Sequence, residues 1–225
     1  MLFLGCIEWA WRQDGMTSRT VTKLDRLPRR PVDKFAERRA ELAEAALQTL
    51  SELGYARTSV REIAQNSAFT HGVLHYYFTD KVDLILCSVR QYKSRCVTRY
   101  DEVTAAASSC NELVEGFLGA LAQTLRDEAH LHRLWYDIRA QAMFEAAFQG
   151  EVAEIDKSLE DMIWRIVSRY GELAGKSPPL PPSAFYAILD GLFQNHLLKY
   201  LSGDKGAVRD LQVNVRLTLA RIFDA

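Results

Sequence analysis

Residues 54–84 read GYARTSVREIAQNSAFTHGVLHYYFTDKVDL, and this stretch decides the fold. Gly54 directly follows a helical apolar pattern, where a glycine commonly ends a helix. Ser59, with Glu62 three positions later, has the spacing of a capping box that begins a short helix. Thr70 is placed to cap a second short helix after a connection of only a few residues. The stretch therefore predicts two short helices joined by a tight turn behind a longer one, a helix-turn-helix.

The sequence on both sides continues with helical periodicity. Upstream, apolar residues step by four, four and three positions from Leu42 to Leu53, which predicts a helix from Phe35 onward. Downstream, one apolar stripe from Ile85 to Cys96 predicts a longer helix. Further helices are predicted at residues 111–128, 131–147, 151–174, 183–201 and 205–223. Because no stretch alternates like a strand between turns, we expect an all-α fold.

The formal net charge of −1 conceals an asymmetry between the two parts of the chain. Residues 1–100 carry 16 Lys+Arg and 11 Asp+Glu, a net of +5, whereas residues 101–225 carry 12 and 18, a net of −6. Much of the positive excess lies in residues 19–39, with eight basic and three acidic side chains. This pattern indicates contact with a polyanion through the first part only. For the basic arm itself, contact with DNA and a solvated tail are equally open.

The segments Gly54–Ala64 and Phe69–Leu84, with their ending YYFTDK, resemble the TetR/AcrR family of bacterial transcriptional regulators. The chain departs from the family pattern at two places. Ser67-Ala68-Phe69 stands where the family usually has Ala-Gly-Val, which costs about 1 kcal/mol if Ala68 must adopt a left-handed conformation. His75 stands where the family usually has Tyr, so either the contact of this side chain depends on pH or the operator preference differs.

The resemblance implies an all-α protein with an N-terminal three-helix helix-turn-helix domain. A linking helix is expected to join this domain to a helical ligand-binding and dimerisation domain. The implied boundaries are a flexible basic extension at 1–34, the DNA-binding domain at 35–83 and the second domain at 84–225.

The helix after Thr70 is unusually polar for a core helix, which favours a role in reading DNA. His71, His75 and Val73 can meet base acceptors or a thymine methyl group, and Gly72 lets the backbone approach closely. The resemblance implies that Arg61 reaches guanine. It also implies phosphate contacts from Ser59, Thr70, Tyr76, Tyr77 and Lys81. For Tyr77, packing inside the domain is the alternative.

The acidic part of the chain is rich in aromatic side chains, as pockets for apolar ligands are. By resemblance, its middle helices enclose an inducer. The candidate ligand-binding residues are Trp135, Arg139, Met143, Phe144, Trp164, Tyr186, Phe193 and Gln194. Ordinary core packing is the alternative for each aromatic residue. Clustered aromatic rings also suit a cationic ligand.

The last two predicted helices carry long apolar stripes, and the family dimerises through these helices. The candidate interface residues are Leu189, Leu192, His196, Tyr200, Leu211, Val215 and Leu219. The alternative is that both stripes face the chain's own core.

Other classes of protein find no support in the sequence. It has no nucleophile motif, phosphate loop or helical pair of metal ligands, so we expect no enzymatic activity and no cofactor. His130-x-His132 lacks further ligands at suitable spacing, and the four cysteines show no C-x-x-C spacing, so no metal site is expected. No apolar run approaches the roughly 20 residues of a membrane span, and the apolar start lacks a basic n-region. A cytoplasmic location is therefore expected.

These observations predict a sequence-specific DNA-binding regulator. Its expected partners are double-stranded operator DNA, a small-molecule effector and a second copy of itself. We expect a repressor that a small, largely apolar ligand releases from a pseudo-palindromic operator. An activator and a ligand-independent DNA-binding dimer remain the alternatives.

Overall fold

A computed structural model describes residues 31–224, with side chains from Lys34 onward, so most of the expected basic extension lies outside the described residues. The helices are α1 (Pro31–Leu53), α2 (Val60–Gln65), α3 (His71–Tyr77), α4 (Lys81–Cys96), α5 (Asp101–Ala106), α6 (Cys110–Asp127), α7 (Ala129–Gln141), α8 (Ala146–Ala174), α9 (Pro182–Leu201) and α10 (Ala207–Asp224). No strand occurs between residues 31 and 224, and the predicted all-α class is confirmed. Within this range no helix is long and apolar enough to cross a membrane.

Several helices differ from those that periodicity predicts. Helix α1 begins at Pro31 rather than Phe35, because proline fits the first turn of a helix, where its missing N–H is not needed. Helix α5 was not predicted, since six residues are too few for a periodic pattern. Helix α7 ends at Gln141, and a turn separates it from α8, so residues 142–145 leave the predicted helix.

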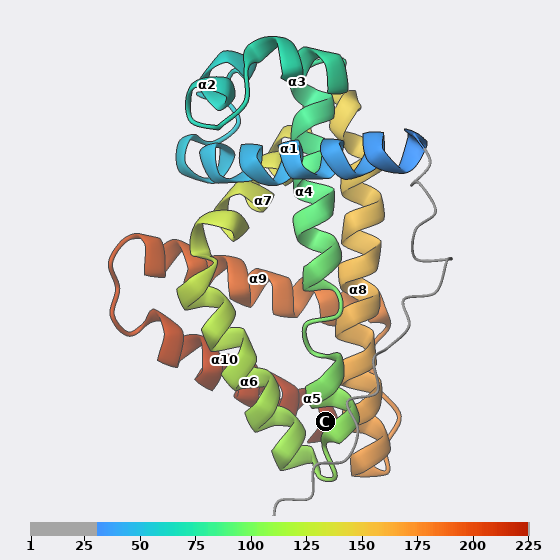
Figure 1. Cartoon of the computed structure of the whole chain (residues 1–225). Helices are drawn as coiled ribbons and strands as arrows, with labels where there is room; N and C mark the ends of the chain where they lie inside the picture. Colours follow the sequence, from blue (N-terminus) through green and yellow to red (C-terminus); the bar gives the residue numbers. More distant parts are fainter. Residues whose placement is uncertain (1–30, 225) are drawn as a thin grey trace, which may run out of the picture.

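The helices form two connected units (Figure 1). Helices α1, α2 and α3 make a small unit at one end of the molecule, and α4 leads from it into the larger bundle. Helix α8 runs beside α4, and the hairpin of α9 and α10 packs against α8 and α6. The small unit therefore packs against the ends of helices that form part of the second unit.

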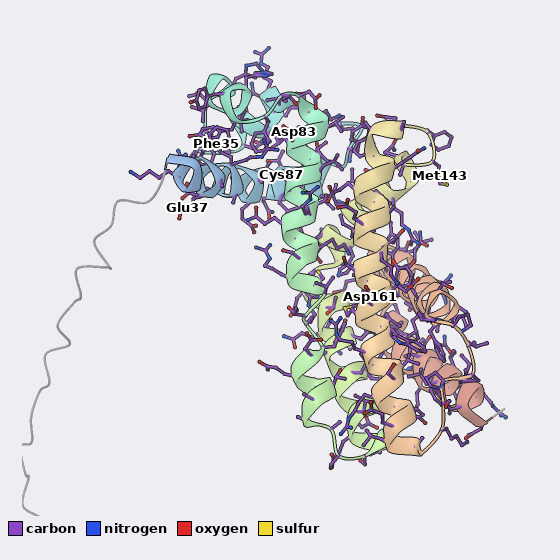
Figure 2. All side chains as sticks on the ribbon, turned by 90° about the vertical axis from the view of Figure 1, so that its right-hand side faces the viewer. Phe35, Glu37, Asp83, Cys87, Met143 and Asp161 are labelled. Carbon is purple, nitrogen blue, oxygen red and sulfur yellow. The ribbon has the colours of Figure 1, made fainter. Side chains whose placement is uncertain are left out.

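One apolar core extends through both units. In the small unit, Leu50, Ile63 and Leu74 are fully buried, which fixes α2 and α3 against α1. Trp135 and Phe148 are the corresponding large buried side chains of the bundle. Burying each such side chain stabilises the fold by roughly 1.5–3 kcal/mol. The side chains between the ribbons are drawn in Figure 2.

Candidate nucleic-acid interface and effector cavity

The two short helices are held at their first turns by the predicted caps. The Ser59 hydroxyl accepts a hydrogen bond from the Glu62 amide at 3.2 Å, and the Glu62 carboxylate accepts one from the Ser59 amide at 2.6 Å. The Thr70 hydroxyl accepts from the Val73 amide at 3.3 Å. Both hydroxyl groups keep their own proton free to donate outward.

The turn between α2 and α3 contains no glycine, although the family usually has one at the position of Ala68. A hydrogen bond of the Ser67 side chain stabilises the turn instead. The Ser67 hydroxyl oxygen accepts a hydrogen bond from the Phe69 amide at 3.3 Å, a local bond typical of serine in turns. The Phe69 ring lies 4.7 Å from the Arg38 guanidinium, which covers it from α1. These contacts position α3 without a glycine in the turn.

The outward face of α3 consists of His71, Gly72, His75 and Tyr76, all exposed. Tyr76 exposes 73% of its surface. A Cβ built on Gly72 would meet no atom within 4 Å, so packing inside the chain does not require a glycine there. The Nε2 atoms of His71 and His75 lie 3.1 Å apart, so one ring donates and the other accepts. This face is free to read a groove.

Two of the predicted DNA contacts are occupied within the domain. The Lys81 ammonium donates to the Tyr55 carbonyl oxygen at 2.6 Å and lies 4.1 Å from the centre of the Tyr55 ring. Desolvation by this partial burial lowers the pKa of Lys81. Tyr77 is half-buried with its ring 4.7 Å from that of Phe35, which is the packing alternative. By contrast, Arg61 is exposed and forms no hydrogen bond or ion pair with another described residue.

Tyr55 joins the DNA-binding unit to the bundle. Its amide donates to the Asp137 carboxylate at 2.8 Å, and its hydroxyl donates to Glu145 at 3.0 Å. Its ring packs edge-on against Phe148 at 5.2 Å. Because Asp137 lies on α7 and Phe148 on α8, this one residue is held by two helices of the second unit.

Gly54 makes this contact between the DNA-binding unit and the bundle possible. It has a φ of +77°, a conformation that side chains rarely adopt, and a Cβ there would lie 3.2 Å from the Asp137 carboxylate. Nearby, the Arg133 guanidinium donates to the Ser51 carbonyl oxygen at 2.6 Å. Helix α7 therefore contacts the end of α1 at two successive turns.

A cavity of about 70 Å³ lies inside the bundle. Its lining residues come from α4, α6, α7, α8 and α9, with Tyr100 between α4 and α5. They are Lys93, Tyr100, Phe117, Leu121, Thr124, His132, Trp135, Tyr136, Leu159, Met162, Ile163, Tyr186, Leu189, Asp190 and Phe193. Of the predicted ligand-binding residues, this set contains Trp135, Tyr186 and Phe193.

The other predicted ligand-binding residues lie elsewhere, and this corrects the sequence-based assignment. Met143 and Phe144 are 73% and 84% exposed in the turn after α7, because that helix ends earlier than predicted. Figure 2 labels Met143 near this turn. Trp164 lies outside the cavity, with its ring 6.3 Å from that of Phe185. Gln194 is exposed over a separate shallow groove of α9. Arg139 does not line the cavity either.

Arg139 instead braces the wall of the cavity from outside. It donates to Asp190 at 2.5 Å and to Asp156 at 3.1 Å. The hydroxyl groups of Tyr136 and Tyr186 donate to Asp190 at 2.8 Å and to Asp156 at 2.6 Å. Burial, and then the neighbouring carboxylate charges, raise the pKa of both tyrosines above the ordinary value. Both carboxylates are therefore engaged within the wall.

Sequence reasoning missed the polar side chains of the cavity. Lys93 lies within an otherwise apolar stripe of α4, and burial lowers its pKa to about 8. Burial also lowers the pKa of His132 well below its usual range, so this imidazole is neutral. The place of Lys93 on that stripe, four residues after Val89, is the signal that points to burial, although a lysine side chain usually lies at the surface.

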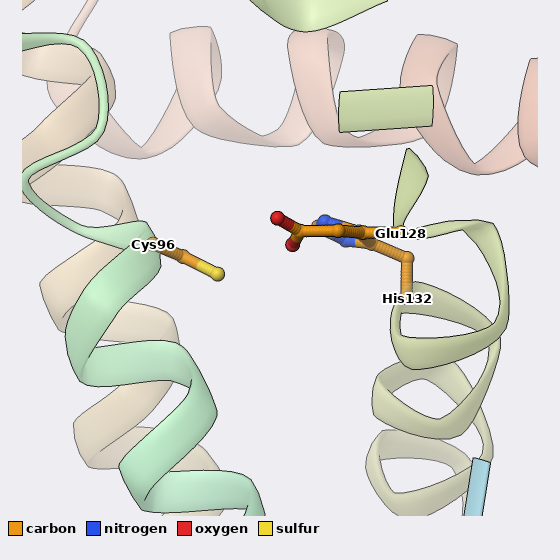
Figure 3. A group of neighbouring side chains, drawn as sticks. All are labelled: Cys96, Glu128 and His132. Atoms are coloured by element: carbon orange, nitrogen blue, oxygen red, sulfur yellow. The ribbon is translucent and has the colours of Figure 1, made fainter. Parts of the chain in front are cut away.

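His132 also belongs to a small cluster with Cys96 and Glu128 (Figure 3). One ligand-type atom from each lies within 4.8 Å of the others, and Cys96 faces the other two from α4. The Glu128 carboxylate already accepts hydrogen bonds from Arg99 at 2.6 Å and from the Tyr92 hydroxyl at 2.6 Å. A cation at this cluster would compete with the Arg99 guanidinium. The paired charges therefore explain the cluster as a structural link between α4 and α7.

The predicted dimer residues are covered by the chain itself. Leu211, Val215 and Leu219 are buried between α10 and its neighbours, and Leu189 is buried as well. His196 is 1% exposed; its Nδ1 lies 2.7 Å from the Leu192 carbonyl oxygen, and its Nε2 lies 3.1 Å from Asn214. Leu192 and Tyr200 are half-buried. The buried members of the stripes pack in the internal core, as the alternative interpretation held for them, because each helix needs its most apolar face inside its own bundle. Leu192 and Tyr200 stay partly accessible, so for these two residues the dimer contact stays a prediction.

The outward surfaces of these helices carry other apolar side chains. Leu198 on α9 and Val213 and Leu217 on α10 are large and exposed. Periodicity did not single them out, since they lie beside the main stripes rather than on them.

A capped, exposed recognition helix on a three-helix unit, joined to a helical bundle with a cavity, defines a helix-turn-helix DNA-binding protein with a sensor-like second domain. Comparison with known proteins agrees. Residues 42–86 match the family described as bacterial regulatory proteins, tetR family. The family model and the named relatives support the TetR family of transcriptional regulators for this chain.

Individual relatives extend the likeness beyond the DNA-binding unit. The chain is 25% identical to the HTH-type transcriptional regulator YfiR of Bacillus subtilis over 84% of this chain and 93% of that one. It is also 25% identical to the HTH-type transcriptional repressor AcnR of Corynebacterium diphtheriae, over 76% and 84% of the two chains.

Solved structures share the fold. A TetR transcription regulator from Haloarcula marismortui superposes with a TM-score of 0.65 at 18% identity, covering 84% of this chain and 97% of that one. The transcriptional regulator FadR from Bacillus subtilis, solved in complex with stearoyl-CoA, gives 0.63 at 16% identity, covering 80% and 96%. These neighbours span both units, so the two-domain arrangement is that of the family.

Proposed function

We propose that the chain represses transcription by binding a pseudo-palindromic operator as a homodimer, with one α3 helix in each half-site. The observation that carries this proposal is the outward face of α3, where His71, Gly72, His75 and Tyr76 are exposed. One recognition helix reads only a few base pairs, so useful specificity requires two at a fixed spacing. The relative AcnR, named a repressor, supports this direction of regulation.

The contacts divide into those that read bases and those that position the protein. We assign His71, Val73, His75 and Arg61 to base edges, with Gly72 allowing close approach. Ser59, Thr70 and Tyr76 suit phosphate oxygens, because their hydroxyl groups face outward from exposed positions. The Lys81 ammonium donates one N–H to the Tyr55 carbonyl and has others left, so Lys81 remains a candidate for a phosphate contact. Tyr77 is proposed to support this contact.

Binding selection on genomic fragments tests this proposal. We expect the purified chain to enrich a pseudo-palindrome whose half-sites lie about one helical turn of DNA apart, or a multiple of it. Tyr76→Ala should weaken binding to that site, whereas the matched control His130→Ala, an exposed residue of α7, should not. Enrichment without a repeated half-site would contradict the dimeric arrangement.

The partner surface is proposed on the exposed apolar residues of α9 and α10 rather than on the buried stripes. Leu217→Glu places a charge on this surface and should shift the protein toward monomers in sedimentation velocity. Phe144→Glu is the matched control, because Phe144 is equally apolar and exposed but lies on the α7–α8 turn. If the double variant with Leu217→Glu and Leu198→Glu is still a dimer, the interface lies elsewhere on the protein.

The bundle cavity is the proposed effector site, and the FadR neighbour, solved in complex with stearoyl-CoA, supports a small-molecule effector. Pockets for drug-sized ligands hold roughly 300–1,000 Å³, so a cavity of about 70 Å³ must widen to admit one. Helix α7 lines the cavity with Trp135 and holds Tyr55 with Asp137. Widening therefore displaces the helix on which the DNA-binding unit rests.

An activator and a ligand-independent dimer are the alternatives. A reporter gene behind the selected operator distinguishes repression from activation by the sign of its response. The expectation that the chain has no enzymatic activity stays a prediction, as does its cytoplasmic location.

A further inference from the structure

Two side chains that line the effector cavity carry buried nitrogen atoms without a hydrogen-bond partner, and a third carries an ammonium group without a carboxylate in contact. The Trp135 indole Nε1 and the His132 Nε2 are buried, and neither forms a hydrogen bond within the described residues. The Lys93 side chain is also buried, and no described carboxylate lies within 4.0 Å of its ammonium group. Buried donors left unpaired are costly and uncommon in folded proteins.

The rings around Lys93 offset only part of that cost. Its Nζ lies 4.9 Å from the centre of the Trp135 ring and 5.4 Å from that of Tyr92. These cation–π contacts supply attraction but no hydrogen-bond acceptor. Because its lowered pKa is still about 8, Lys93 is mainly protonated at neutral pH. The cavity therefore holds a positive charge that lacks a counter-ion in contact.

The nearest carboxylates have partners of their own. Asp190, which lines the cavity, accepts hydrogen bonds from Arg139 and Tyr136. Glu128 is paired with Arg99 at 2.6 Å. Both carboxylates lie near enough to raise the pKa of Lys93, but neither lies within 4.0 Å of its ammonium group.

The remaining lining is largely apolar. It includes Phe117, Leu121, Leu159, Met162, Ile163 and Phe193. A ligand that fits both kinds of wall has an apolar body and a compact anionic end.

We infer that the effector is an amphipathic carboxylate, whose carboxylate accepts hydrogen bonds from Lys93 and from the Trp135 indole N–H while its apolar body replaces the packing of the lining. This inference rests on the proposed effector site and specifies its ligand class. Charge-assisted bonds of this kind are about twice as strong as neutral ones. A cationic ligand would meet Lys93 with the same charge, so the aromatic rings do not form a cation cage here.

Binding of matched compounds tests the inference on the full-length protein. Phenylbutyl, octyl and decyl tails are each presented with a carboxylate, an amide or an ammonium end, and binding is measured by calorimetry. We expect the carboxylate to bind about tenfold more tightly than the amide of the same tail, and the ammonium compound to bind most weakly.

Two variants locate the preference. Lys93→Met keeps an apolar stem of similar length and removes the charge, and it should abolish the advantage of the carboxylate over the amide. Trp135→Phe removes the N–H and should reduce that advantage about threefold. Lys199→Met, at an exposed lysine of α9, is the matched control and should leave it unchanged. Circular dichroism and operator affinity confirm that each variant is folded, and the wild-type comparison stands without them.

The outcomes separate this inference from the proposed function. Equal binding of amide and carboxylate, or a preference that survives Lys93→Met, overturns the carboxylate class, whether or not the compounds release DNA. No binding by any carboxylate of the series also overturns it. Carboxylates that bind through Lys93 without weakening operator binding would support the inference and contradict ligand-controlled repression.

Discussion

The outward face of α3 and the lining of the bundle cavity use polar side chains in opposite ways. On α3, the side chains of His71, His75 and Tyr76 are exposed, and the two imidazoles contact each other. In the bundle, polar groups are buried, and all but a few are tied into pairs such as Arg139 with Asp190. We therefore expect substitutions on the outward face of α3 to alter DNA binding with little effect on folding. Substitutions in the cavity lining are expected to alter both ligand binding and folding.

The largest expected effect is the loss of stability when a large side chain is removed from the cavity wall. Trp135 is 1% exposed, so Trp135→Ala removes a large buried ring and should lower the free energy of unfolding by about 3–5 kcal/mol. Urea denaturation measures it. Tyr76→Ala, at a residue that is 73% exposed, should stay within about 0.5 kcal/mol of wild type. Similar losses for both would break the contrast between the two regions.

The next effect concerns base reading by α3. His75→Ala should cost about 1–3 kcal/mol of discrimination at one base pair, because its exposed ring is one of the groups proposed to reach base edges. Repeating the binding selection with the variant measures this as a changed preferred sequence. An unchanged preference would remove His75 from the base-reading set.

A pH effect tests the buried lysine. Its pKa is about 8 in the folded protein against 10.5 for the ordinary group, so the unfolded chain binds more protons between these values. Stability contributed by this group should therefore rise with pH above about 8, by roughly 2 kcal/mol between pH 7 and 9.5. The comparison of wild type with Lys93→Met in urea at both pH values isolates this contribution from other titrating groups. Parallel pH dependence in the two proteins would show that Lys93 titrates normally.

The smallest effect separates two roles of Lys81. Lys81→Met removes the bond to the Tyr55 carbonyl and should cost about 1 kcal/mol of stability. If Lys81 also contacts a phosphate, the variant should bind every DNA sequence more weakly, with a salt slope lower by about 1. A loss of stability with an unchanged salt slope would assign Lys81 to the domain joint alone.

The sequence predicted the parts of the molecule that depend on neighbours along the chain. The Ser59–Glu62 capping box, the Thr70 cap and the two short helices are confirmed because each is specified within a few residues. The cavity was predicted only through Trp135, Tyr186 and Phe193, since which face of a helix lines a cavity depends on how distant helices pack.

The errors have the same origin. Met143 and Phe144 were assigned to the pocket on the assumption of one helix through residue 147, and the early end of α7 exposes them. The apolar stripes of α9 and α10 were correct as stripes, but their direction toward the chain's own core was decided by α6 and α8. Lys93 escaped notice because a lysine side chain usually lies at the surface, although its place on the apolar stripe of α4 pointed to burial.

Gly54 carries a consequence for rebuilding this protein from parts. Gly54 has a positive φ, and a Cβ there would lie 3.2 Å from the Asp137 carboxylate. The contact between the N-terminal unit and α7 therefore depends on a glycine at this position and on the residue that α7 places opposite it. A chimera that joins this DNA-binding unit to a foreign sensor domain must bring an acceptor for the Tyr55 amide at the place of Asp137. Under the proposed mechanism, a chimera without that match should bind DNA independently of the effector.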